Sequence, residues 1–166
     1  SEIISKPATY PLFESNSDNA NYKYTGVFPN ISPMSDGINR LYGYNIVMPT
    51  THIVNTLITN NDPRLEEWID PIAGTTNHKG VQPGLALDQI GEPTKYSRRA
   101  EDYFYNKTKI TSIFMTYSEL NFLLAEARQR NIITTGTAQG YYNTAVEASF
   151  NQWNVAMPAN YLITTA

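Results

Sequence analysis

The feature that most constrains the fold is a pair of amphipathic segments between Phe114 and Trp153. The first segment has one apolar helix face, whose residues follow the i, i+3, i+4 and i+7 spacing: Leu120, Leu123, Leu124 and Ala127. Thr116 precedes this face, and Glu119 lies three residues later. This is the pattern of a capping box, in which the hydroxyl accepts from the Glu119 amide and the carboxylate returns to the Thr116 N–H. The spacing therefore predicts a helix that begins just after Thr116.

The second segment follows Thr137, which is a suitable N-cap residue. Its inward positions keep the helical spacing as far as the tryptophan, and they are Ala138, Tyr141, Tyr142, Ala145, Val146, Ser149, Phe150 and Trp153. The intervening stretch, Asn131–Gly136, interrupts the pattern with β-branched residues and a glycine. Because the connection is short, we predict an antiparallel αα-hairpin. A lone hairpin leaves one apolar side uncovered, so we expect it to stack on other helices, as in tetratricopeptide arrays.

These two segments resemble the signature hairpin of the SusD/RagB family, the glycan-capturing outer-membrane lipoproteins of Bacteroidetes. That family commonly reads Tyr-x-Glu-(Leu/Val)-x-Phe-Leu-x-Ala-Glu-Ala, then a loop, then a Tyr-Tyr-x-x-Ala-(Ile/Val)-x-x-Ser helix that ends in Trp. The matching residues here are Tyr117, Glu119, Leu120, Phe122, Leu123, Ala125, Glu126, Ala127, Tyr141, Tyr142, Ala145, Val146, Ser149 and Trp153. Two further matches lie upstream in family order, NDPRL at Asn61–Leu65 and HKGVQPGL at His78–Leu85.

The resemblance implies a mainly α fold of the α/α superhelix type, with tetratricopeptide-like hairpins, long irregular loops and at most minor β structure. It implies a non-catalytic protein without a cofactor that binds oligosaccharides on the outward face of the outer membrane. The implied partner is a SusC-like TonB-dependent transporter, with which the protein would work in nutrient uptake. Any link to the membrane would be a lipid anchor, which this chain lacks because it contains no cysteine. We therefore expect the chain to be the C-terminal part of a larger secreted protein.

Charge and residue content argue against several classes of function. The net charge of −3 and the pI near 5.3 disfavour nucleic acid, which needs a basic surface, and direct binding to an anionic membrane. The lack of cysteine excludes disulfides and thiolate metal sites. His52 and His78 stand in no HExxH pattern, so we predict no metal site. We also find no nucleophile elbow or phosphate-binding loop, and therefore predict no enzyme.

We expect residues 1–166 to form a single domain or a fragment of one. The predicted parts are a loop-rich stretch (residues 1–50), short helices (51–70), irregular loops (71–113) and the αα-hairpin (114–157). In the second part, Thr50 or Thr51 caps one helix. Asp62 caps the next, with Pro63 at its first position, where the missing N–H is harmless. Leu65, Trp68 and Ile69 are expected to face inward.

Aromatic residues supply the candidates for ligand binding, since sugar rings stack on flat aromatic surfaces while amides and acids bind their hydroxyls. The chain has 12 Tyr, 6 Phe and 2 Trp. The glycan-binding candidates combine an aromatic or cationic side chain with polar neighbours on a loop, and they are Tyr103, Tyr105, Trp68, Tyr42, Tyr44, Tyr96 and Arg98. For Trp68 a role in the core is favoured over ligand binding. Tyr103 and Tyr105 are the best candidates for the surface.

Two alternatives to glycan binding stay open. In the first alternative, the segment is a helical-repeat scaffold that contacts the transporter and binds no sugar. In the other it is a glycoside hydrolase. Adjacent carboxylates occur at Glu66/Glu67 and Glu101/Asp102, but neighbouring residues of a helix point apart, so they do not indicate a glycosidase pair.

Overall fold

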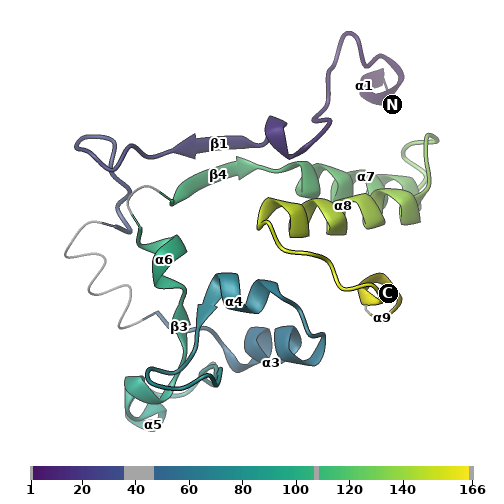
Figure 1. Cartoon of the computed structure of the whole chain (residues 1–166). Helices are drawn as coiled ribbons and strands as arrows, with labels where there is room; N and C mark the ends of the chain where they lie inside the picture. The colour runs from purple at the N-terminus through teal and green to yellow at the C-terminus, as the bar shows by residue number, and fades with distance from the viewer. Residues whose placement is uncertain (1, 36–46, 107–108, 165–166) are drawn as a thin grey trace. The chain divides into compact units, whose positions relative to one another are not determined.

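The structure is a computed structural model, and it describes residues 2–35, 47–106 and 109–164. Within these residues the chain is mainly helical and contains two two-stranded sheets, which confirms the predicted fold class (Figure 1). The chain falls into two compact units. Unit 1 consists of Ser1–Tyr22 and Ile113–Met157, and unit 2 consists of Lys23–Ser112 and Pro158–Ala166.

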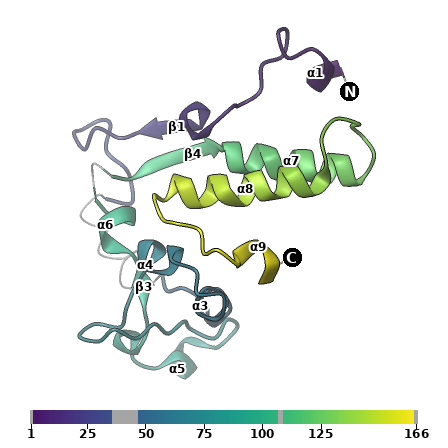
Figure 2. The same cartoon turned by 45° about the vertical axis from the view of Figure 1, so that its right-hand side comes forward.

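The centre of unit 1 is the predicted hairpin, in which α7 (Tyr117–Gln129) and α8 (Ala138–Gln152) run antiparallel side by side (Figures 1 and 2). Both helices begin where the sequence predicts. The Thr116 hydroxyl accepts from the Glu119 amide at 3.0 Å, which is one of the two bonds of the capping box, and Thr137 accepts from the Gly140 amide at 3.0 Å. The hairpin prediction is therefore confirmed.

The face of α7 that meets α8 differs from the predicted one. The buried residues of α7 are Ser118, Asn121 and Ala125, whereas Leu123 is 50% exposed. Small side chains at this face let the two backbones approach each other, so that the Ser118 hydroxyl donates to the Ala145 carbonyl at 2.7 Å. The expectation that Leu123 lies on the buried face of α7 is therefore wrong, because Ser118, Asn121 and Ala125 occupy that face instead.

Four short elements accompany the hairpin. The helix α1 (Glu2–Ser5) and the 3₁₀-helix η1 (Asn16–Asp18) precede strand β1 (Ala20–Lys23), which pairs with β4 (Thr111–Met115). The η1 turn packs against both α7 and α8. The Asn16 amide donates to the Ala148 carbonyl at 2.9 Å, and Asn19 Oδ1 accepts from the Tyr117 amide at 2.6 Å.

The core of unit 2 lies between α3 (Thr51–Thr59) and α4 (Arg64–Trp68). It contains Val54, Leu57 and Ile69, with the partly buried Leu65 and Trp68 packed against it. Thr50, one of the two residues predicted for this position, is the N-cap of α3, although its side chain makes no capping hydrogen bond. The inward positions predicted for Leu65, Trp68 and Ile69 are also confirmed.

A buried ion pair holds the C-terminal helix α9 (Tyr161–Thr164) within unit 2. The Asp62 carboxylate accepts from the Arg64 amide at 3.0 Å, and it lies 2.5 Å from Arg64 Nη2. The Tyr161 hydroxyl donates to Asp62 at 2.8 Å and accepts from Arg64 Nη2 at 2.8 Å. The prediction that Asp62 is the N-cap and Pro63 the first helical residue is wrong by one position, because α4 begins at Arg64 with Pro63 as its N-cap. The Asp62 carboxylate nevertheless accepts from the Arg64 amide.

The remaining elements of unit 2 are short. Strand β2 (Ile69–Asp70) pairs antiparallel with β3 (Arg98–Arg99), so that Ile69 lies opposite Arg99 and Asp70 opposite Arg98. The helices α5, η2 and α6 span Leu87–Ile90, Pro93–Lys95 and Glu101–Phe104. At the start of α3 the chain passes so close to Gly80 that an added Cβ would lie 2.3 Å from the Thr50 carbonyl carbon.

Candidate functional site

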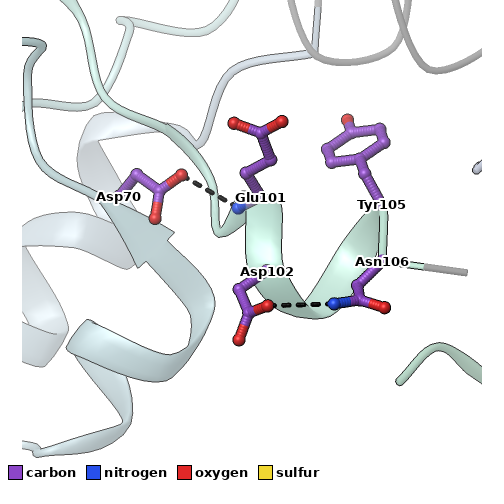
Figure 3. A pocket seen from close by; sticks show the side chains of 5 residues that line it. All are labelled: Asp70, Glu101, Asp102, Tyr105 and Asn106. Carbon is purple, nitrogen blue, oxygen red and sulfur yellow. Dashed lines mark hydrogen bonds between the residues drawn. The ribbon is translucent and has the colours of Figure 1, made fainter. Parts of the chain in front are cut away.

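A hollow beside α6 in unit 2 gathers several acidic side chains (Figure 3). We call it the acidic hollow, and it is lined by Asp70, Glu101, Asp102, Tyr105 and Asn106. Its volume is about 410 Å³, which lies within the range of ordinary small-ligand sites. Figure 3 shows Glu101 and Tyr105 on one side of α6 and Asp102 and Asn106 on the other. This follows from the spacing of four residues, which places two side chains on the same helix face.

The acidic hollow is built by strand pairing between two distant parts of the chain. Pairing of β2 with β3 brings Asp70 to the first turn of α6, where its Oδ2 accepts from the Glu101 amide at 2.9 Å. One residue earlier, the Ala100 amide donates to the Trp68 carbonyl at 2.9 Å. On the opposite face of α6, Asp102 accepts from Asn106 Nδ2 at 3.1 Å and pairs with Lys109. Two of the carboxylates are therefore held in place by hydrogen bonds.

The two aspartates of the hollow have opposite electrostatic surroundings. Burial raises the pKa of Asp70, and the nearby Asp102 charge adds to the rise, while His78 opposes it. Hydrogen bonds from Lys109 and then Asn106 lower the pKa of Asp102, which is exposed to solvent. Carboxylates accept hydrogen bonds, so the hollow suits ligands that donate them, such as sugar hydroxyls, and disfavours anions.

Among the glycan-binding candidates that the structure describes, Tyr105 alone lines the acidic hollow. It is only 2% exposed, and its hydroxyl accepts from Arg99 Nη2 at 2.8 Å. The expectation that this ring lies on the surface is therefore wrong, because the Arg99 side chain and the surrounding chain cover it. Tyr103 is half-buried and packs edge-on against Phe104, with 5.2 Å between ring centroids. Its role in ligand binding stays a prediction.

The other candidates lie elsewhere in unit 2 or outside the described residues. Trp68 is half-buried beside the core, with the Arg64 guanidinium 5.2 Å from its ring centroid. The Tyr96 hydroxyl donates to the Ile90 carbonyl at 2.9 Å, and Arg98 is 9% exposed. Ligand roles for these side chains stay predictions as well. Tyr42 and Tyr44 fall outside the residues that the structure describes.

Sequence reasoning missed Asp70 and Glu101 as partners in one site. They are 31 residues apart, and no local spacing connects them. The available signals were the short β2 and β3 segments, but strands of two residues have no detectable alternation. In the sequence, Asp102 stands out as the carboxylate adjacent to Glu101, and both Asp102 and Asn106 stand out as polar neighbours of Tyr103 and Tyr105.

Neither a cluster of potential metal ligands nor a bilayer-spanning helix occurs in the described part of the chain. There, no group of three or more His, Cys, Asp or Glu side chains is arranged to hold a metal ion. His78 contacts the Ile69 carbonyl through Nε2 at 3.0 Å and stands 3.9 Å from the Glu66 carboxylate. No helix among the described residues has the length and apolar character needed to span a bilayer.

The fold and the acidic hollow together define a mainly helical protein whose polar site is carried by loops and short elements. The chain belongs to a SusD-like family, because the sequence profile of that family matches residues 1–166 and is described as starch-binding and associating with the outer membrane. No curated protein matches the chain.

Solved structures of SusD homologues resemble the chain over nearly its full length. One from Bacteroides fragilis has a TM-score of 0.75 and 26% identity, and the match covers 93% of this chain and 35% of the other. One from Bacteroides vulgatus has a TM-score of 0.73 and 26% identity, with 96% and 32% coverage. A chitin-binding SusD homologue from Flavobacterium johnsoniae shares the fold, with a TM-score of 0.72, 22% identity, and 92% and 30% coverage. The chain thus spans about a third of the length of these proteins.

Proposed function

We propose that this chain is part of a non-catalytic glycan-binding protein on the outward face of the outer membrane. The observation that carries the proposal is the match of the whole chain to a family described as starch-binding and outer-membrane-associated. The names of two structural neighbours add support, since each is called chitin-binding. The acidic hollow supplies a site of suitable size and chemistry within unit 2.

In this proposal the acidic hollow binds the hydroxyls of a neutral oligosaccharide. Each hydrogen bond to a carboxylate contributes about 1.5–3 kcal/mol net, so a few of them, offset by the cost of ordering the ligand, give a modest affinity that suits capture and release. The carboxylates of Asp70, Glu101 and Asp102 repel uronic acids and sulfated sugars. A SusC-like TonB-dependent transporter then takes up the captured glycan.

Isothermal titration calorimetry with maltoheptaose and chitohexaose tests the binding. We expect heat with at least one of them, and weaker binding in Glu101→Gln and Asp102→Asn, because each change removes a charged acceptor from the hollow. Glu66→Gln is the matched control, since the Glu66 side chain is 70% exposed and lies outside the hollow. Chromogenic glycosides should show no turnover. Equal affinities in the three variants would contradict the assignment of the site.

A second candidate function is a scaffold that contacts the transporter without binding sugar. The observation that favours it is the exposed apolar surface of unit 1, where Phe114, Leu123 and Phe122 are 75%, 50% and 40% exposed. Copurification with the transporter from outer membranes, together with no measurable binding to any member of a glycan panel, would favour this scaffold. Binding of sugar by the chain would instead favour the first function.

A further inference from the structure

His78 is a buried titratable residue beside the acidic hollow, and the proposed function gives it no role. Its side chain is only 6% exposed, although it lies in a loop. Its Nε2 lies 3.0 Å from the Ile69 carbonyl oxygen. Ile69 is directly followed in the chain by Asp70, which lines the acidic hollow. Strand β2 therefore connects the imidazole to the wall of the hollow.

The surroundings of His78 suit the protonated imidazole. A carbonyl oxygen can only accept, so Nε2 must carry a hydrogen and donate it to Ile69. The other ring nitrogen, Nδ1, lies 3.9 Å from the Glu66 carboxylate of α4. In the neutral imidazole, Nδ1 then has only a lone pair and faces another acceptor. In the imidazolium both nitrogens carry hydrogens and both face an acceptor. The geometry is thus complementary to the charged form of the ring.

Asp70 is a carboxylate that needs a nearby cation to stay ionised in acid. Burial raises its pKa and the charge of Asp102 adds to the rise, whereas His78 opposes it. Arg98 lies opposite Asp70 in the β2–β3 pair, but within the described residues these two side chains form no hydrogen bond or ion pair with each other. Lys109 pairs with Asp102 instead. His78 is therefore well placed to offset the cost of the Asp70 charge.

The other charged groups near this pair have different contacts. Glu101 lines the same hollow, and it presents its backbone amide to Asp70 Oδ2 at 2.9 Å. Lys79 follows His78 in the chain, but its ammonium nitrogen lies 5.1 Å from the centroid of the Tyr96 ring. The imidazole is thus associated with two carboxylates, one outside the hollow and one in its wall.

We propose that His78 is a counterion built into the acidic hollow, which carries a positive charge in mild acid and keeps the Asp70 carboxylate ionised. An ionised carboxylate is the stronger acceptor, because a charge-assisted hydrogen bond is roughly twice as strong as a neutral one. The hollow then keeps its affinity for sugar hydroxyls over a wider range of pH. The effect on sugar binding rests on the proposed function, whereas the pairing of the two charges does not.

The test is an NMR titration of the carboxyl carbons in the ¹³C-labelled chain, from about pH 8 down to about pH 3.5, which spans the usual range of aspartate and histidine. In His78→Gln the new amide can still donate to the Ile69 carbonyl, but the charge is lost. The midpoint of the Asp70 signal should therefore rise by roughly 0.3–1 pH unit. His52→Gln is the matched control, since His52 is exposed on α3, and it should leave the midpoint unchanged.

The wild type provides a second readout that does not depend on the folding of a variant. Its Asp70 signal should show a second, smaller inflection at the pH at which the His78 ring signals move, and none at the pH at which the His52 signals move. Absence of this inflection overturns the proposal. An Asp70 midpoint in folded His78→Gln that equals the midpoint in His52→Gln overturns it as well.

Calorimetry with maltoheptaose and chitohexaose at two pH values separates the counterion from the proposed function. At about pH 7.5, His78→Gln should bind like the wild type, and at about pH 5 it should bind roughly two- to fivefold more weakly. If the Asp70 midpoint rises but neither sugar binds at either pH, the counterion stands and binding of these two sugars fails. If sugar binds and the midpoint is unchanged, the counterion is overturned and glycan binding stands. If the midpoint rises while the affinity at about pH 5 equals that of the wild type, the role of His78 in sugar binding is overturned.

Discussion

Replacing Arg64 by alanine tests the buried network that anchors α9. The Asp62 and Arg64 side chains are 1% and 11% exposed, so the pair is almost fully removed from water. In Arg64→Ala the Asp62 carboxylate keeps the backbone amide of residue 64 and the Tyr161 hydroxyl, but loses the contacts from Nε and Nη2. Removing one partner of a buried ion pair costs about 3–5 kcal/mol, because the other charge is left uncompensated.

Urea denaturation followed by circular dichroism measures this cost. With a slope of about 2 kcal/mol per M, a loss of 3–5 kcal/mol lowers the midpoint by about 1.5–2.5 M. Arg130→Ala is the matched control, since the Arg130–Glu126 pair is exposed at 68% and 53% and its N···O distance is 2.7 Å. An exposed pair contributes less than about 1 kcal/mol. Tyr161→Phe removes only a hydroxyl and should fall between the two, at about 1–3 kcal/mol.

The dependence on pH gives a second readout of the same network. Burial alone would raise the pKa of Asp62, but hydrogen bonds from Arg64 and Tyr161 outweigh it and lower the pKa below its usual value. Because the folded pKa is lower than the unfolded one, the stabilisation is fully present above about pH 4 and is lost as the pH falls through the folded pKa. The difference between wild type and Arg64→Ala should therefore shrink in acid. Equal midpoints for Arg64→Ala and Arg130→Ala at pH 7 would refute a stabilising role for the buried pair.

Three further changes test other parts of the structure by urea denaturation. Asp70→Asn should raise the midpoint slightly at pH 7, because burial raises the pKa of Asp70 and its charge is therefore unfavourable at neutral pH. This advantage should disappear in acid, where Asp70 is protonated in the wild type as well. A lower midpoint at pH 7 would contradict this prediction. Ala145→Leu should lower the free energy of unfolding by about 1–3 kcal/mol or more, since Ala145 is 0% exposed where the helices of the hairpin meet. An unchanged midpoint would mean that the two helices do not pack closely. Gly80→Ala should destabilise unit 2 by more than about 1 kcal/mol, because the Cβ of the new alanine would collide with backbone atoms of Thr50. A midpoint equal to that of the wild type would show that this close approach is absent.

The sequence by itself determined the elements that depend on local pattern. The 3.6-residue spacing and the caps at Thr116 and Thr137 predicted both helices of the hairpin and their starts, because a capping hydroxyl and an apolar stripe act within one or two turns. The inward positions of Leu65, Trp68 and Ile69 were also predictable, since their apolar spacing is local. The hairpin motif and NDPRL lie on or beside these same elements, whereas HKGVQPGL at His78–Leu85 lies in a loop.

Only the tertiary structure decided which faces meet and which side chains share a site. Leu123 has the spacing of a core residue, yet the helices meet at Ser118 and Ala125, because small residues allow the closest approach of two backbones. Asp70 joins Glu101 through strand pairing, and Asn16 reaches α8 across 132 residues of sequence. Such contacts depend on the path of the whole chain, and local spacing carries no information about them.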